Sequence, residues 1–294
     1  MPTIVHVLIS AYLLSMMFSM GLSLGGEVED RPSKHRRRRL LVRALVFNLV
    51  LLPAIALLLV NVLHPSQDGR IAILLLAACP GGRFAPHLCR MARGELALSV
   101  EITLFLAKLT VLTAPLMARW TLHLTQVEIH ELPLIARLLV LQLLPFVVGK
   151  QLRRRLGARV APLARPLELA SWLCALVIVV LLLHAREMRI VTLLSAGDWL
   201  VVLIFATLSL GLAWLLGGRS GPVRRTFAIS ANARDLALAL VVVDAALPEH
   251  RLRLTICGAW LLFFLFDLGF ARWSHRHAPT PEPTALGHEV PTPA

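Results

Sequence analysis

Apolar stretches of about 20 residues alternate with short polar segments along almost the whole chain. Each stretch is long enough to cross a hydrocarbon core of about 30 Å as a helix. The pattern predicts an all-α polytopic membrane protein with nine transmembrane helices and leaves no room for a soluble catalytic domain. The predicted spans are residues 3–25, 40–63, 71–91, 95–118, 131–149, 166–184, 196–217, 226–245 and 253–272. Residues 273–294 are polar and rich in proline, which predicts a disordered tail.

Composition and charge agree with this pattern and orient it. The 294 residues are 57% hydrophobic, above the roughly 45–50% of a soluble domain, and carry a net charge of +13. The basic residues gather between the spans, chiefly in 25–43 and 150–165, without the aromatic-rich basic fold of a nucleic-acid-binding protein. The positive-inside rule then predicts an external N-terminus and a cytoplasmic C-terminus. Residues 1–26 lack a basic start and exceed the length of a signal-peptide core, so we expect a first span there.

Two of the predicted spans are interrupted. The third contains a cluster of helix breakers at 80–86, and the eighth contains a polar run at 230–235. Broken helices at membrane depth are tolerated only around a cavity, and secondary transporters place substrate and ion sites there. The two spans are five apart, an odd offset that reverses orientation, as inverted repeats require. We therefore expect the breaks to lie next to each other near the membrane centre.

Charged residues inside the spans are expected to face protein or water and to be paired. Arg83 and Arg234 are central, and we expect Asp235 or Glu101 to pair with Arg234. Four other charges inside the spans have an alternative, because long side chains can snorkel to the interface and the span boundaries can be displaced by a turn. These are Lys108, Arg137, Asp244 and Asp267.

Four stretches follow one another in the order and spacing of a known family, namely MMFSMGLSLGGEVEDR, FNLVLLPAIALLL, CPGGRFAPHLCRMARGELALS and RRTFAISANARDLALAL. In these stretches the sequence resembles the bile acid:sodium symporter family. The resemblance implies inverted repeats of five helices with two crossing discontinuous helices, the first of the family's ten helices being absent here. It also implies a core domain, residues 40–118 and 196–272, that moves against a panel domain, residues 3–25 and 131–184.

The same resemblance places the family's sodium ligands, and most are substituted. Ala85 and Pro86 replace a Ser-Asn pair, Ser230 replaces a glutamate, and Arg234 and Asp235 replace a Gln-Asn pair. The positions that keep an oxygen ligand are Asn48, Ser99 and Thr103. Sodium coupling is therefore expected to be lost or altered, with Arg234 standing in for the ion and held by Asp235, Glu101 or Ser230.

The predicted function is secondary active transport of a small organic anion, with Arg83, His87, Asn232, Arg234 and Asp235 at the substrate crossover. His87 would carry a coupling proton, or would simply bond a freed carbonyl. Metalloid efflux through Cys79 is an alternative, although buried cysteines usually serve as small apolar residues. Membrane enzymes lack support, because no HExxH, GxSxG or Walker motif is present, and a sensor with a transporter fold stays open.

Overall fold

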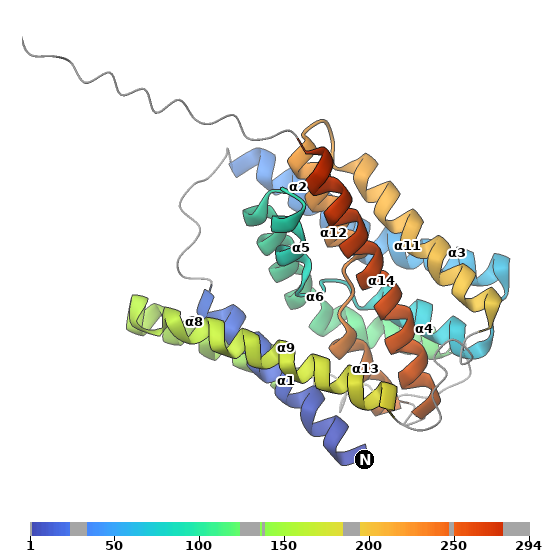
Figure 1. The fold of residues 1–294 in the computed structure, drawn as a ribbon, viewed down its shortest axis with the longest axis horizontal. Helices are drawn as coiled ribbons and strands as arrows, with labels where there is room; N and C mark the ends of the chain where they lie inside the picture. Colours follow the sequence, from blue (N-terminus) through green and yellow to red (C-terminus); the bar gives the residue numbers. More distant parts are fainter. Residues whose placement is uncertain are drawn as a thin grey trace, which may run out of the picture.

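The computed structural model describes residues 2–23, 34–123, 136, 139–184, 195–246 and 250–278. Within them the protein is all-helical (Figure 1). The longer helices are α1 (Pro2–Ser23), α2 (Lys34–Val46), α3 (Leu52–Leu63), α4 (Gln67–Ala78), α5 (Ala85–Met91), α6 (Leu96–His123), α8 (Leu144–Leu156), α9 (Ala164–His184), α11 (Ala196–Leu216), α12 (Gly221–Asn232), α13 (Leu236–Ala246) and α14 (His250–His277). Short π-helical turns at Phe47–Leu51 and Leu139–Leu143 lead into α3 and α8, and a 3₁₀ segment at Gly157–Leu163 joins α8 to α9.

The helices form two groups of unequal size. α1 packs against α8 and α9, and these three lie across one side of the molecule (Figure 1). The larger group holds α2 to α6 and α11 to α14, with α12 against α11, α5 and α6. A continuous apolar core runs through the larger group from Leu52 and Phe47 to Phe205 and Phe263.

Three helices in the described part are long and apolar enough to cross a membrane, namely Arg37–Leu63, Ala196–Leu216 and Leu252–His277. Large apolar side chains such as Val50, Leu58, Leu176, Leu215 and Leu265 are exposed on the outside of the helices. Apolar surface of this extent indicates contact with lipid rather than water. The prediction of an all-helical, multi-pass membrane protein is confirmed. The first part of the predicted span 131–149 lies largely outside the described residues.

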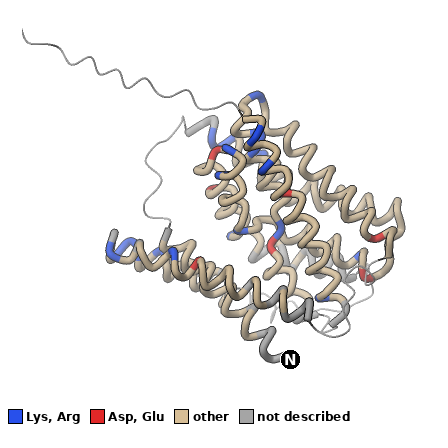
Figure 2. Tube along the Cα trace, in the orientation of Figure 1, with Lys and Arg blue, Asp and Glu red and all other residues tan. Residues whose placement is uncertain are grey.

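The helices continue past the predicted spans at their basic ends. α2 begins at Lys34, α8 runs to Leu156 and α14 runs to His277, so much of the segments taken as loops is helical. For α8 the cause is local, because the helix ends only at Gly157, whose φ is +60°. Figure 2 shows Lys and Arg gathered where α2 begins, where α14 ends and at the C-terminal end of α8.

Candidate functional site at two crossing helix breaks

The first break separates α4 from α5. α4 ends at Ala78, and Cys79 to Phe84 form a non-helical segment before α5 begins at Ala85. Gly81 has φ +91°, a backbone conformation that side chains disfavour. At Gly82 an added Cβ would lie 2.7 Å from the Arg234 carbonyl oxygen, so the two breaks approach too closely there for any side chain.

The second break separates α12 from α13 without glycine or proline. Ala233 to Asp235 leave the helix in an extended conformation, with φ −65° and ψ +111° at Ala233. The Asp235 Oδ1 atom then accepts a hydrogen bond of 3.2 Å from the amide of Leu238. This carboxylate satisfies an unpaired donor at the first turn of α13 and so helps the helix to restart.

The two breaks are joined by an isolated antiparallel β-bridge between Pro80 and Arg234. The amide of Gly82 donates to the Ala233 carbonyl at 3.0 Å, and the amide of Asp235 donates to the Cys79 carbonyl at 2.9 Å. These bonds use backbone groups that the breaks would otherwise leave unsatisfied. The prediction that both spans are interrupted, and that the breaks lie together, is confirmed.

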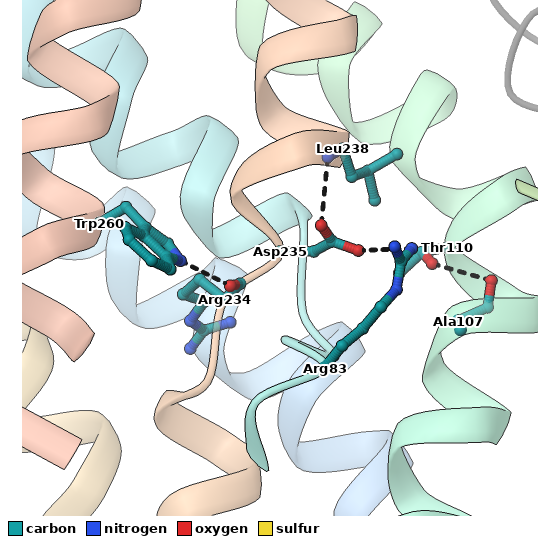
Figure 3. A network of polar contacts seen from close by, with 7 residues as sticks. All are labelled: Arg83, Ala107, Thr110, Arg234, Asp235, Leu238 and Trp260. Carbon is teal, nitrogen blue, oxygen red and sulfur yellow. Dashed lines mark hydrogen bonds and ion pairs between the residues drawn. The ribbon is translucent and has the colours of Figure 1, made fainter. Parts of the chain in front are cut away.

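Arg83 and Asp235 form an ion pair across the crossing. Arg83 Nη2 lies 3.0 Å from Asp235 Oδ2, and both side chains are buried (Figure 3). The Nε and Nη1 atoms of Arg83 have no hydrogen-bond partner in the described part of the chain. Tyr12 of α1 lies within electrostatic range of both charges. The pair therefore sits where the larger helix group faces α1, and part of its donor capacity is unused.

Arg234 points to the other side of the crossing, as Figure 3 shows. Its side chain is fully buried, and its guanidinium carbon lies 5.5 Å from the ring centre of Phe205 and 5.9 Å from that of Phe263. None of its three guanidinium nitrogens has a hydrogen-bond partner within the residues described. Its carbonyl accepts a 2.9 Å bond from Trp260 Nε1, which fixes the backbone.

The predicted pairing of Arg234 with Asp235 or Glu101 is wrong. Asp235 pairs with Arg83, and Glu101 pairs with Arg37, whose Nε lies 2.5 Å from Glu101 Oε2. Successive side chains in an extended segment point to opposite sides, so Arg234 and Asp235 cannot both face one partner. Glu101 lies on the α6 face toward α2 and does not join the crossing.

A buried polar network behind the crossing takes the place of the predicted partners. Asn232 Nδ2 donates to Asp267 Oδ1 at 3.0 Å, and Ser209 Oγ donates to Asn232 Oδ1. Asp267 is fully buried, acts electrostatically on Arg234, and its Oδ2 atom has no hydrogen-bond partner in the described part. The alternative that Asp267 snorkels to the interface is therefore wrong. Lys108, by contrast, is exposed beside the rings of Phe105 and Phe146.

A hydroxyl cluster joins α6 to α12. Ser99 Oγ and Ser230 Oγ are 3.4 Å apart, and Thr103 Oγ1 donates to the Ser99 carbonyl at 2.9 Å. Asn48 is buried in η1, where its Nδ2 donates to the Ala44 carbonyl and its Oδ1 has no partner among the described residues. Of the predicted ion-site positions, the structure thus brings Ser99, Thr103 and Ser230 together, whereas Asn48 bonds within its own helix and Glu101 pairs with Arg37.

Comparison with known proteins identifies the family. Residues 10–193, more than half of the chain, match the sequence profile described as the sodium bile acid symporter family. The chain belongs to the sodium bile acid symporter family. A relative from Bacillus subtilis (strain 168), described as the uncharacterized sodium-dependent transporter YocS, is 28% identical over 109 residues. That similarity covers 37% of this chain and 33% of the relative, so the chain spans about a third of the length of the curated relative that it matches.

The printed descriptions of the family and of the relative name a symporter and a transporter, respectively. The profile match includes the first break and ends before the second. The second break thus lies outside the profile match. In the structure, the backbone hydrogen bonds at Ala233 and Asp235 hold it against the first break.

His87 lies at the edge of the site. Its side chain is 51% exposed, its Nε2 contacts Glu168 Oε1 of α9, and its ring meets Trp172 edge-on at 6.1 Å. Among the described residues its polar partner is a carboxylate on the other helix group, and no bond to a carbonyl freed at the break is seen there. Sequence patterns gave no signal for Phe205, Phe263 or Ser209, which look like ordinary residues of apolar helices. Glu168 is a charged residue inside the predicted span 166–184, and that charge was an available signal.

Cys79 and Cys89 are both buried. The Cys79 carbonyl forms one of the crossing bonds, and the Cys89 thiol lies 3.2 Å from Thr226 Oγ1. No group of three or more His, Cys, Asp or Glu side chains that could hold a metal ion occurs within the described residues.

Proposed function

We propose that the protein is a secondary transporter that moves a small organic anion by alternating access. Substrate would pass between a core domain, residues 40–118 and 196–272, and a panel domain, residues 3–25 and 131–184. The separation of α1, α8 and α9 from the other helices supports this division (Figure 1). The fold proposed for the whole chain is nine spans in two inverted repeats, with the N-terminal end outside and the C-terminal end cytoplasmic.

This proposal rests on the guanidinium donors of Arg83 that have no hydrogen-bond partner in the described part of the chain. A buried guanidinium at a helix break faces α1, and two of its nitrogens have no hydrogen-bond partner in the part of the chain described. Unsatisfied buried donors are costly, so a ligand that accepts from them gains their full hydrogen-bond energy. A carboxylate or sulfonate matches the planar fork of arginine, which favours an anionic solute.

The test is a thermal-shift screen of purified protein against bile acids and keto acids, followed by flux of the stabilising anion in proteoliposomes. A ligand of the native state raises Tm by mass action. The informative variant is Arg83→Gln/Asp235→Asn, which removes both charges of the pair together. We expect it to melt near the parent temperature without ligand and to lose the ligand-induced rise and the flux.

Arg37→Gln is the matched control, because Arg37 is also paired with a carboxylate but lies away from the crossing. It should keep both the ligand response and the flux. If the double variant at the crossing responds to the anion as the parent does, Arg83 does not bind the substrate.

Sodium is proposed to contribute little to this transport, although the family description and the relative's name both refer to sodium. Arg234 already places a fixed positive charge near the buried Asp267. Two unit charges about 4 Å apart repel by about 4 kcal/mol at an effective dielectric near 20, which would erase a millimolar sodium site beside Arg234. Flux that collapses when choline replaces sodium at constant pH would overturn this part of the proposal.

A further inference from the structure

Three arginines on α2 face outward without an acidic partner. Arg38, Arg39 and Arg43 are exposed and form no ion pair with any acidic residue of the described part. Their neighbour Arg37 faces inward, where its Nε contacts Glu101 and its Nη2 donates to the Ala97 carbonyl at 3.4 Å. These contacts with α6 fix the rotation of α2, so the outward direction of the other arginines is set by the fold.

The outward arginines border a defined hollow. Together with Val42 they line a surface cavity of about 390 Å³. Arg39 and Arg43 are four residues apart, which places them on the same face of the helix and makes their charges repel. An anion between them would remove this repulsion, and the guanidinium fork binds phosphate oxygens in pairs. The chemistry of the hollow therefore suits a phosphate group.

An apolar stripe continues from the hollow along the same helix. Val42, Val46 and Val50 recur at intervals of four residues and are 50%, 54% and 62% exposed. The continuous apolar helix Arg37–Leu63 has 27 residues, or about 40 Å at 1.5 Å per residue, which matches a bilayer with its headgroup regions. The valines thus lie at the depth of acyl chains and the arginines at the depth of headgroups.

We propose that this hollow binds the phosphate of an anionic phospholipid, with one acyl chain lying along Val46 and Val50. A soluble phosphate would meet the same arginines but would leave the valine stripe uncovered, and a zwitterionic lipid would bring no net charge to it. The inference concerns the outer surface of α2 and does not depend on the transported solute.

The experiment uses the full-length protein in neutral detergent with short-chain phosphatidylglycerol, phosphatidylcholine or inorganic phosphate added at equal concentrations. Tm is measured for the parent, for Arg38→Gln/Arg39→Gln/Arg43→Gln and for the control Arg154→Gln/Arg155→Gln/Arg159→Gln. The control removes the same number of exposed charges from the end of α8 and the segment after it. The apparent dissociation constant for each lipid comes from the dependence of Tm on lipid concentration.

We expect phosphatidylglycerol to stabilise the parent and the control more than phosphatidylcholine does. The α2 variant should bind it about 100-fold more weakly, roughly fivefold per arginine. An equal loss in both triple variants would show a general charge effect and overturn the site. A rise with inorganic phosphate equal to that with phosphatidylglycerol would overturn the assignment to a lipid, as would a parent that does not distinguish the two lipids.

Discussion

At the scale of single residues, the crossing divides its two arginines between different tasks. Arg83 is balanced by Asp235 and keeps donors toward α1, whereas Arg234 lies among Phe205, Phe263 and the Asn232–Asp267 network. Consecutive residues of one extended segment, 234 and 235, thus serve opposite sides. In the proposed transport, the Arg83 side binds the solute and the Arg234 side balances charge inside the protein.

Arg234→Gln should destabilise the protein strongly, because Asp267 would then be buried without a nearby cation. Removing one member of a buried charge pair costs about 3–5 kcal/mol. Arg234→Gln/Asp267→Asn should recover most of that loss, since neither charge remains, and Tm measurements on both single variants and the double variant form a cycle. Losses that simply add in the double variant would show that the two charges do not interact.

At the scale of helices, the sequence predicted the breaks well and the side-chain partners poorly. Proline and glycine at 80–86 and a polar run at 230–235 are local signals, and local signals are enough to interrupt a helix. Which carboxylate meets which arginine depends on backbone direction at the second break, which no local pattern specifies. Asp267 was ambiguous for the same reason, because depth and facing follow from packing.

Gly82→Ala tests how tightly the two breaks are joined. The new Cβ would lie within 2.9 Å of backbone atoms of Ala233 and Arg234, so the crossing must shift. We expect a loss of about 1–3 kcal/mol in stability, measured as a lower Tm, together with reduced flux. Gly211→Ala is the control, because nothing lies within 4 Å of its Cβ and a helical alanine should be neutral or slightly stabilising. Equal behaviour of the two variants would contradict the close approach.

At the scale of the whole molecule, two side-chain contacts differ in the helices that they join. They are the contact of His87 with Glu168 and the contact of Ser15 with Ser171. The first links α5 to α9 between the two helix groups, and the second links α1 to α9 within one group, with the hydroxyl oxygens 2.8 Å apart. If the groups move against each other during transport, only the first contact must break. This difference makes the proposed motion testable.

Cysteine pairs can be bridged at the two contacts in a Cys174→Ser background. A flexible bis-maleimide suits the more exposed pair at His87 and Glu168, and oxidation to a disulfide suits the part-buried pair at Ser15 and Ser171, whose hydroxyl oxygens are 2.8 Å apart. Bridging His87→Cys/Glu168→Cys should stop flux in proteoliposomes, and bridging Ser15→Cys/Ser171→Cys should leave it unchanged. The measurement is flux of the stabilising anion before and after bridging. Transport that continues with α5 bridged to α9 would contradict motion between the groups.

The proposed orientation can be checked at two exposed loop positions. Ser195 precedes α11 and Arg219 follows it, so a spanning α11 places them on opposite sides. With Ser195→Cys we expect an impermeant maleimide to label intact cells, and with Arg219→Cys only after lysis. The reverse pattern would invert the assigned topology, and labelling of both in intact cells would exclude α11 as a span.

The hydrogen bonds that join the backbones of the two breaks run between amide and carbonyl groups. Every residue type except proline has both of these groups, so these backbone hydrogen bonds do not depend on which side chains the positions carry. Position 234 can therefore carry a guanidinium while these bonds form. The positions of Gly81, whose φ is +91°, and Gly82, which has no room for a Cβ, favour glycine. A chain built this way can exchange the charged side chains at the crossing, and with them the charge that the site presents, without any change in how its helices are connected.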